Sequence, residues 1–273
     1  MIQIRGGLTE PEVREKLQCV TAFVIDQDGT TYLEQKVFPW TIPFLNGLKA
    51  RGRKYLFLSN NSSKSLKEHL EKLISIGIDV IPEQILSSTD ATLEYLKSLN
   101  YSDEIFLMAT PPVEQDFEKA GFNIRSDHPR YVVLAYDLTL TFDKLDRACR
   151  FVRKGVPFIA THEDANWLIG PNDFRPDVGS LAAAITASTK VAPKFIGKPN
   201  TEMVNAFLKR LNVCKDEVAL IGDKLNTDIR MGQDHGILSF LVLSGQTSAE
   251  EIPDSPWQPD VLVGKTIDIL DFL

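Results

Sequence analysis

Residues 22–30 read AFVIDQDGT, an apolar run that ends in two carboxylates and a glycine. The run predicts a buried strand of a parallel sheet. Asp26 and Asp28 are two residues apart, so an extended backbone would direct both side chains to one side and turn Gln27 away. Two carboxylates that close repel each other unless a cation lies between them. The alternative is that the acids and Gly29 form a simple turn after the strand.

Apolar runs like this one alternate with segments of helical spacing, which predicts βαβ units and an α/β fold around a mainly parallel sheet. The predicted strands of this sheet are 22–25, 55–58, 218–221 and 236–243, and its predicted helices include 62–76, 200–211 and 226–235. Polar groups follow three of the strands, at Asp26, Ser59 and Asp223. Because ligands of open α/β sheets bind beyond the carboxyl ends of the strands, these groups should converge on one crevice.

A second series of strands and helices occupies the middle of the chain and requires a sheet of its own. Its predicted elements are strands 105–108, 131–136 and 157–160 and helices 113–120 and 142–154. We therefore predict a core domain in two parts, 1–85 and 191–273, around an inserted domain at 86–190. Residues 1–18 form an N-terminal extension of the core, in which Thr9–Glu12 has the capping-box pattern of a short helix.

Charge and cysteine usage narrow the class of protein. The 273 residues include 30 basic and 37 acidic side chains, a net charge of −7, so nucleic acid polymers and anionic membranes are not expected partners. Cys19, Cys149 and Cys214 lack metal-ligand spacing and are typical of reduced thiols. The chain shows no signal peptide and no apolar run near the roughly 20 residues that span a bilayer. We expect a cytoplasmic protein.

The polar groups after the strands suit a phosphate and a metal ion. Asp223 would join Asp26 and Asp28 in an oxygen-rich site of the kind that Mg²⁺ prefers. Gly29 would let the chain turn so that backbone N–H groups face an anion. Three further motifs have plainer alternatives, which are a helix cap for Ser59–Asn61, a solvated loop lysine for Lys198 and a helix-start acid for Asp228.

Four motifs, taken in order, resemble those of the haloacid dehalogenase superfamily. They are DxDGT at 26–30, SNN at 59–61, GKP at 197–199 and GDxxxTD at 222–228. The long insertion, the segment Val178–Leu181 and the pair Asn60–Asn61 are similar to its NagD-like type IIA branch. The resemblance covers nearly the whole chain from about residue 20. It implies a Rossmann-like, doubly wound parallel core with an inserted α/β cap of type C2.

The resemblance also implies a role for each motif. Asp26 would be the nucleophile that forms an aspartyl-phosphate, and Asp28 the general acid and base. Mg²⁺ would be held by Asp26, the Asp28 carbonyl and Asp223, with support from Asp228. Lys198 would neutralise charge on the transferring group. The remaining phosphate-site residues would be Gly29, Thr30, Ser59, Asn60 and Asn61.

Residues 160–167, ATHEDANW, resemble the loop of the cap that contacts the substrate. The predicted contacts are His162, Asp164 and Asn166. His162 has an equal alternative as a solvated loop residue, and the other two have one as turn residues. Trp167 would pack in the cap core or in a dimer contact.

Two functions of different classes fit these patterns. The favoured one is a Mg²⁺-dependent phosphatase of small phosphate monoesters such as sugar phosphates or nucleotides. The other is a non-catalytic phosphate-binding or scaffold protein that retains the fold. The resemblance also implies a homodimer that forms through the cap.

Overall fold

The computed structural model describes residues 2–99, 103–170 and 173–273. The chain divides by its internal contacts into two compact units. The first unit comprises Met1–Ser59, Leu70–Leu86 and Val204–Leu273, and the second comprises Asn60–His69 and Ser87–Met203.

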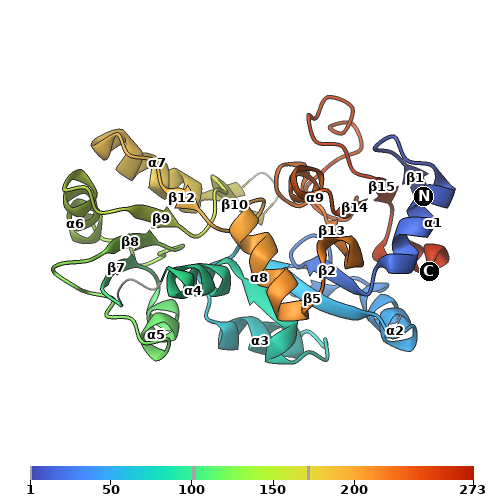
Figure 1. Cartoon of the computed structure of the whole chain (residues 1–273), viewed down its shortest axis with the longest axis horizontal. Helices are drawn as coiled ribbons and strands as arrows, with labels where there is room; N and C mark the ends of the chain where they lie inside the picture. Colours follow the sequence, from blue (N-terminus) through green and yellow to red (C-terminus); the bar gives the residue numbers. More distant parts are fainter. Residues whose placement is uncertain (1, 100–102, 171–172) are drawn as a thin grey trace. The chain divides into compact units, whose positions relative to one another are not determined.

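A seven-stranded sheet forms the centre of the first unit, in the order β1-β15-β14-β13-β2-β5-β6 (Figure 1). Its strands are β1 (Ile2–Ile4), β2 (Ala22–Asp26), β5 (Lys54–Ser59), β6 (Ile85–Ser87), β13 (Val218–Gly222), β14 (Leu238–Val242) and β15 (Val261–Val263). β2 pairs in parallel with both β5 and β13, and β14 and β15 continue the parallel pairing, whereas the edge strand β1 is antiparallel. The chain therefore moves outward from β2 in both directions, which confirms the predicted doubly wound α/β core.

The predicted strands of this sheet are all present. β2, β5, β13 and β14 lie within two residues of the predicted ends, the largest difference being 236–243 against Leu238–Val242. Every residue of β2, β13 and β14 is buried, which explains why their sequences are continuous apolar runs rather than alternating ones. The short strands β1, β6 and β15 were not predicted, because runs of three residues carry no periodicity.

Helices and a small hairpin complete the first unit. They are α1 (Glu10–Cys19), α2 (Thr41–Ala50), the 3-10 helices η1 (Pro82–Gln84), η2 (Lys215–Glu217) and η4 (Thr266–Phe272), the π-helix η3 (Leu225–Ile229), α9 (Arg230–His235), and strands β3 (Tyr32–Leu33) and β4 (Lys36–Val37). α1 begins with the predicted capping box, in which Thr9 donates through its backbone N–H and its hydroxyl to Glu12 at 2.7 Å each. Arg14 of α1 donates to the carbonyl of Asp271 at 3.0 Å, so the N-terminal extension is tied to the C-terminal end of the chain.

Two helices, α3 (Leu66–Ser75) and α8 (Thr201–Leu211), have residues in both units. α3 begins four residues later than the predicted start at Ser62. Asn61 and Ser63 form a side-chain turn instead, since Asn61 Oδ1 accepts from the Ser63 N–H at 2.9 Å. Ser65 and Glu68 then form a reciprocal capping box, with Ser65 N–H to Glu68 Oε2 at 2.8 Å and Glu68 N–H to Ser65 Oγ at 3.2 Å.

The second unit contains a four-stranded parallel sheet in the order β12-β9-β8-β7 and a separate hairpin of β10 and β11. Its strands are β7 (Ile105–Met108), β8 (Tyr131–Leu134), β9 (Phe158–Ala160), β10 (Asn166–Gly170), β11 (Asp173–Pro176) and β12 (Lys194–Phe195). Its helices are α4 (Ser88–Ser98), α5 (Pro111–Lys119), α6 (Phe142–Arg153) and α7 (Val178–Thr189). The three predicted strands and two predicted helices of the insertion are present.

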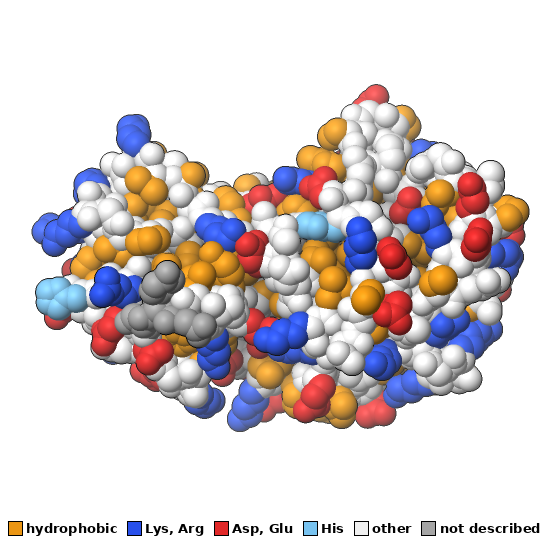
Figure 2. Space-filling view, viewed as in Figure 1, with side chains coloured by type: hydrophobic (Ala, Val, Ile, Leu, Met, Phe, Trp, Pro, Cys, Tyr) orange, Lys and Arg blue, Asp and Glu red, His pale blue; other side chains and the backbone are white. Residues whose placement is uncertain are grey.

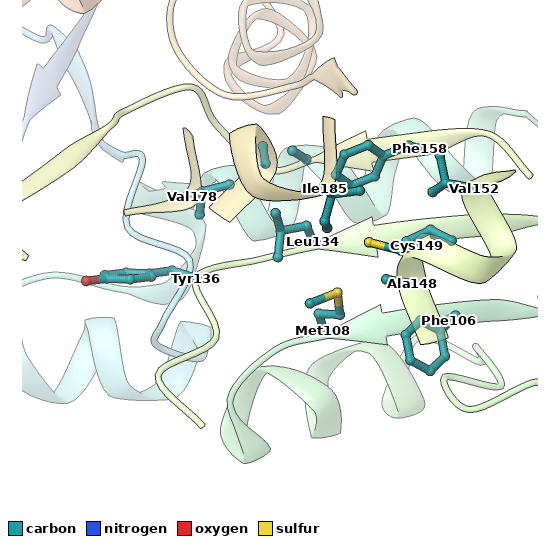
Figure 3. Close-up of a cluster of buried hydrophobic side chains, with 13 residues drawn as sticks. Phe106, Met108, Leu134, Tyr136, Ala148, Cys149, Val152, Phe158, Val178 and Ile185 are labelled. Carbon is teal, nitrogen blue, oxygen red and sulfur yellow. The ribbon is translucent and has the colours of Figure 1, made fainter. Parts of the chain in front are cut away.

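Buried side chains of the strands, α6 and α7 form the core of this unit (Figure 3). Leu134 of β8, Cys149 of α6 and Ile185 of α7 meet there. α7 was not predicted, although its buried residues Val178, Ala182 and Ile185 have the spacing of one helix face. β11 was not predicted either, because all four of its residues are exposed.

The second unit comprises Ser87–Met203 and the separate segment Asn60–His69, whereas the predicted insertion is 86–190. Residues 60–69 belong to it, and so does β12, in which Lys194 and Phe195 pair with Ile159 and Ala160 of β9. The boundary between the two units therefore depends on contacts between residues more than 30 positions apart in the sequence. Turn residues in the sequence do not indicate such contacts.

The surface carries both basic and acidic side chains, as expected from the 30 basic and 37 acidic residues of the sequence. Basic and acidic side chains are interspersed over the face shown in Figure 2. None of the helices in the described ranges combines the length and the apolar character needed to cross a membrane. Cys19, Cys149 and Cys214 are free thiols.

Candidate active site

Three buried carboxylates lie together at the carboxyl ends of the central strands of the first unit. Asp26 is the last residue of β2, Asp223 follows β13, and Asp228 lies in the π-helix η3. Each offers an oxygen, and these oxygens lie within 4.8 Å of one another. The structure thus brings together three of the four acids predicted for the metal site.

Glycines make room for this cluster. A Cβ on Gly222 would lie 2.2 Å from Cγ of Asp228, and a Cβ on Gly245 would lie 1.9 Å from Oδ2 of Asp223. Gly29 adds a third close approach, 2.4 Å from the same Asp223 oxygen, and its φ of +85° also favours glycine. The backbone N–H of Gln246 donates to Asp223 Oδ2 at 2.7 Å and fixes that carboxylate.

These residues fit a divalent cation. Three carboxylates so close together and buried would destabilise the fold by mutual repulsion unless positive charge lies among them. The donor atoms are all oxygens, which Mg²⁺ and Ca²⁺ prefer over the nitrogen and sulfur ligands of zinc.

The carboxylate of Asp28 has a different environment. β2 ends at Asp26, and the chain then turns, with the Gly29 N–H donating to the Tyr32 carbonyl at 2.8 Å. The strand stops at Asp26, and the acid cluster comprises Asp26, Asp223 and Asp228 without the Asp28 carboxylate. Asp28 is half-exposed, and its Oδ1 lies 3.2 Å from Nζ of Lys72.

Tyr32 is the second partner of Asp28, with its hydroxyl 3.3 Å from Oδ2. Burial raises the pKa of the Tyr32 phenol well above its usual value, and the negative charges of Asp28 and Asp26 raise it further. The phenol therefore keeps its proton and can donate it in a hydrogen bond.

The other predicted phosphate-site residues of the first unit are Thr30 and Ser59, and both are buried. Ser59 ends β5, whose Leu58 pairs with Asp26 of β2, so Ser59 lies at the same edge of the sheet as the carboxylate cluster.

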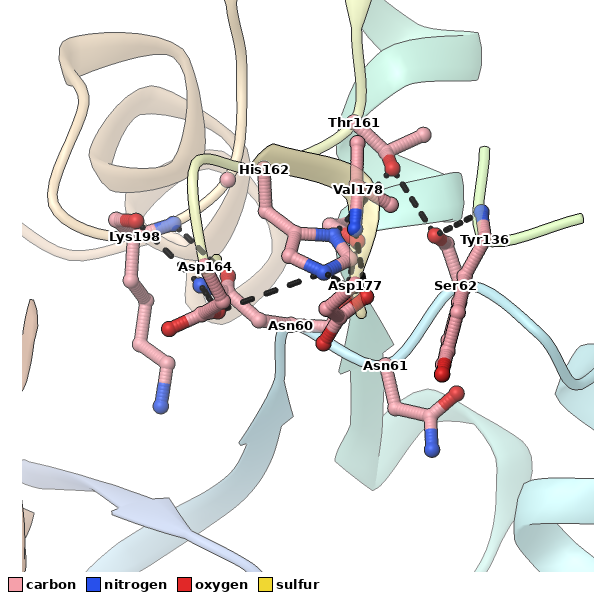
Figure 4. A network of polar contacts seen from close by, with 12 residues as sticks. Asn60, Asn61, Ser62, Tyr136, Thr161, His162, Asp164, Asp177, Val178 and Lys198 are labelled. Atoms are coloured by element: carbon pink, nitrogen blue, oxygen red, sulfur yellow. Dashed lines mark hydrogen bonds and ion pairs between the residues drawn. The ribbon is translucent and has the colours of Figure 1, made fainter. Parts of the chain in front are cut away.

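A second group of predicted residues meets inside the second unit (Figure 4). The Asn60 amide donates to Asp164 Oδ2 at 2.8 Å and to the Lys198 carbonyl at 3.2 Å, and its Oδ1 accepts from the Lys198 N–H at 2.8 Å. A Cβ on Gly197 would lie 2.6 Å from Asn60 Oδ1, so this contact requires glycine. The second and third sequence motifs and the loop 160–167 are thus joined through one amide.

His162 is buried, with 1% of its surface exposed, so its interpretation as a solvated loop residue is wrong. Its Nε2 lies 3.1 Å from Oδ1 of Asp177, and its Nδ1 lies 3.2 Å from the Thr161 hydroxyl. Asp177 also caps α7, since the same oxygen accepts from the Val178 N–H at 2.7 Å. Asp177 was missed, although an acid directly before a helix is a recognisable cap signal.

The remaining predicted residues have plainer surroundings. Asn61 forms a side-chain turn with Ser63, and Ser65 rather than Asn61 caps α3, so the interpretation of its motif as a helix cap is wrong. Asn166 is exposed in β10, opposite Pro176. Trp167 packs in the core of the second unit, with its ring 6.1 Å from that of Tyr136.

Sequence reasoning also missed Gly245, Gln246 and Lys72. The first two follow β14, so the rule that placed ligands after the other strands would have found them. Lys72 gave no signal, since a lysine on a helix is ordinarily a solvated side chain.

Two family models match the chain. The haloacid dehalogenase-like hydrolase model matches residues 23–123, and a HAD-hydrolase-like model matches residues 195–269. The acid sugar phosphatase of Staphylococcus aureus is 31% identical over 87% of this chain and 92% of its own length. The 5′-nucleotidase YutF of Bacillus subtilis is 30% identical over 87% and 92%. The dihydroxyacetone phosphatase of Corynebacterium glutamicum is 29% identical over 92% and 90%.

Solved structures agree with these matches. The 4-nitrophenylphosphatase of Thermotoga maritima superposes with a TM-score of 0.89 at 36% identity, covering 94% of this chain and 98% of that one. NagD from E. coli gives a TM-score of 0.85 at 26% identity, covering 93% and 99%. With the ordered motifs and the carboxylate cluster, these likenesses show that the chain belongs to the NagD-like branch of the haloacid dehalogenase superfamily and is a phosphoric monoester hydrolase.

Proposed function

We propose that the enzyme is a Mg²⁺-dependent phosphatase that hydrolyses small phosphate monoesters through an aspartyl-phosphate on Asp26. The buried cluster of Asp26, Asp223 and Asp228 carries this proposal, because it offers a nucleophile and a cation site at one strand end. Relatives named as phosphatases of sugars and dihydroxyacetone and as a nucleotidase support small metabolites as the substrate class.

The metal would be held by the carboxylates of Asp26 and Asp223 and the carbonyl of Asp28, with Asp228 in support. Mg²⁺ bound there supplies the positive charge that lets an anionic nucleophile approach an anionic ester. The close packing of Gly29 and Gly245 against Asp223 supports this assignment, because it holds one ligand rigidly in place.

The carboxylates of this chain would perform two successive displacements. Asp26 attacks phosphorus, the bond from phosphorus to the leaving oxygen breaks, and Asp28 gives that oxygen a proton. Water then attacks the phosphorus of the aspartyl-phosphate while Asp28 accepts its proton. The bond between phosphorus and Asp26 breaks, which releases inorganic phosphate and restores the Asp26 carboxylate and the protonated Asp28 carboxyl.

Ser59, the Asn60 amide and Lys198 would bind the phosphoryl oxygens and balance their charge, as the motif resemblance implies. Gly29, Thr30 and Asn61 would shape the loops around the phosphate. In the loop 160–167, the contacts of Asp164 and His162 support a role in ordering the loop. We propose that the exposed side chain of Asn166 contacts the leaving group of the substrate.

A hydrolysis screen tests the proposal. The panel contains sugar phosphates, dihydroxyacetone phosphate, nucleoside 5′-monophosphates and 4-nitrophenyl phosphate, each assayed with Mg²⁺ and with EDTA. We expect phosphate release from at least one metabolite, loss of release with EDTA and recovery on adding Mg²⁺. No release from any ester would favour the non-catalytic scaffold, and release unaffected by EDTA would remove the metal from the mechanism.

A further inference from the structure

The first unit contains three side chains around Asp28 that the proposed mechanism does not use. Lys72 reaches Oδ1 of Asp28 at 3.2 Å, and the Tyr32 hydroxyl reaches Oδ2 at 3.3 Å. Both oxygens of this half-exposed carboxylate therefore have a donor. A carboxylate held at both oxygens cannot rotate about its χ angles without losing one of these contacts.

Lys72 is itself held in position. Its ammonium lies 4.0 Å from the centroid of the Tyr32 ring, which is a cation–π contact. Its side chain is 16% exposed, against 49% for Asp28. A lysine that is mostly withdrawn from water, over an aromatic ring and against a carboxylate, acts as a fixed donor rather than as a mobile surface charge.

Gln27 extends this arrangement. Its Oε1 lies 3.0 Å from the Tyr32 hydroxyl, and its Nε2 is buried with no hydrogen-bond partner among the described residues. Amide oxygen and nitrogen are assigned from the hydrogen-bond network, and rotating this amide by half a turn lets Nε2 donate to the Tyr32 oxygen. The single phenolic proton is then left for Asp28. One rotation thus gives the buried Nε2 a partner and resolves the competition for that proton.

We infer that Lys72, Tyr32 and Gln27 are positioning residues that hold the Asp28 carboxyl where it can protonate the leaving oxygen. This inference rests on the proposed function, because it assigns Asp28 as the general acid. General acid catalysis contributes about 10²–10⁴-fold, and a displacement of about 1 Å in a catalytic group costs about 10²-fold. Loss of one donor should therefore lower the rate of those steps that need the proton.

The leaving group distinguishes positioning from structural damage. A sugar alcohol needs a proton as it departs, whereas 4-nitrophenolate is a stable anion that departs without one. The ratio kcat/KM covers the steps up to that departure and excludes the later hydrolysis, in which Asp28 acts as a base. We expect Lys72→Met to lower kcat/KM for the best sugar phosphate by about tenfold or more and for 4-nitrophenyl phosphate by less than about threefold.

Two further variants remove the other contacts. Tyr32→Phe keeps the ring and removes the phenolic proton, and Gln27→Leu removes the amide at similar size. Both should show the same selective loss, smaller than that of Lys72→Met because the ion pair remains. Lys72→Arg should recover most of the activity, since it keeps a cation over the ring.

Lys49→Met is the matched control. Lys49 lies 5.9 Å from the centroid of the Tyr55 ring and 3.5 Å from Asp79 Oδ2, the same kind of pairing on α2. Lys49→Met should leave kcat/KM unchanged for both substrates.

Equal losses on both substrates, no loss on either, or a gain in activity from Lys72→Met would overturn the inference while the proposed function stands. A wild-type enzyme that hydrolyses neither ester would instead refute the proposed function, and the inference with it.

Discussion

Gly245→Ala tests the carboxylate cluster without changing any charged group. The new Cβ would lie 1.9 Å from Asp223 Oδ2, whereas an ordinary contact is at least 3.4 Å. The carboxylate must therefore move by about 1.5 Å, the difference of these two distances, and lose its bond from the Gln246 N–H. A shift of this size should lower kcat/KM about 10²-fold.

The metal response gives a second, independent readout. Saturating Mg²⁺ stabilises a protein that binds it by about 2.7 kcal/mol when its concentration is 100 times Kd. The wild-type Tm should therefore rise with Mg²⁺, and that of Gly245→Ala should rise much less at the same concentrations. Gly52→Ala is the control, because its Cβ would meet open space and its φ of +67° costs stability alone. If Gly245→Ala keeps the wild-type Mg²⁺ dependence of both Tm and rate, Asp223 is not a ligand.

Two further predictions concern single carboxylates. Asp26→Asn should abolish turnover while the protein stays folded by circular dichroism, because the amide is not a nucleophile; wild-type rates would exclude Asp26 from that role. Asp116→Asn should raise Tm near neutral pH, since burial raises the pKa of Asp116 and the folded state thus penalises its charged form. The sign of the effect follows from that direction: the gain should vanish below the unfolded pKa, where Asp116 is protonated in both states. A gain of equal size at low pH would contradict burial of the charged carboxylate as its cause.

Local patterns predicted the core strands and the first ligands of the site. The residues of β2 and β13 are buried on both faces, so each strand has a continuous apolar sequence. A predicted metal ligand, Asp26 or Asp223, stands at the end of each run. Contacts between residues distant in the sequence could not be predicted from local sequence patterns. Asn60 meets Asp164 across 104 positions and Lys198 across 138, and each contact depends on how the strands are ordered in space rather than on neighbouring residues. The same holds for the boundary of the second unit, which follows the pairing of β12 with β9.

Asp26 and Asp28 lie two residues apart, but only Asp26 belongs to the carboxylate cluster. A fourth carboxylate in that cluster would place four acids around one divalent charge. Three carboxylates already exceed the charge of Mg²⁺ by one, so a fourth would add repulsion without adding neutralisation. The Asp28 carboxylate is not part of the cluster and instead contacts Lys72 and Tyr32. Two acids two residues apart thereby acquire different surroundings, one anionic and one with cationic and hydroxyl donors. We propose that these different surroundings accompany different roles, with Asp26 as the nucleophile beside the cation site and Asp28 as the proton carrier.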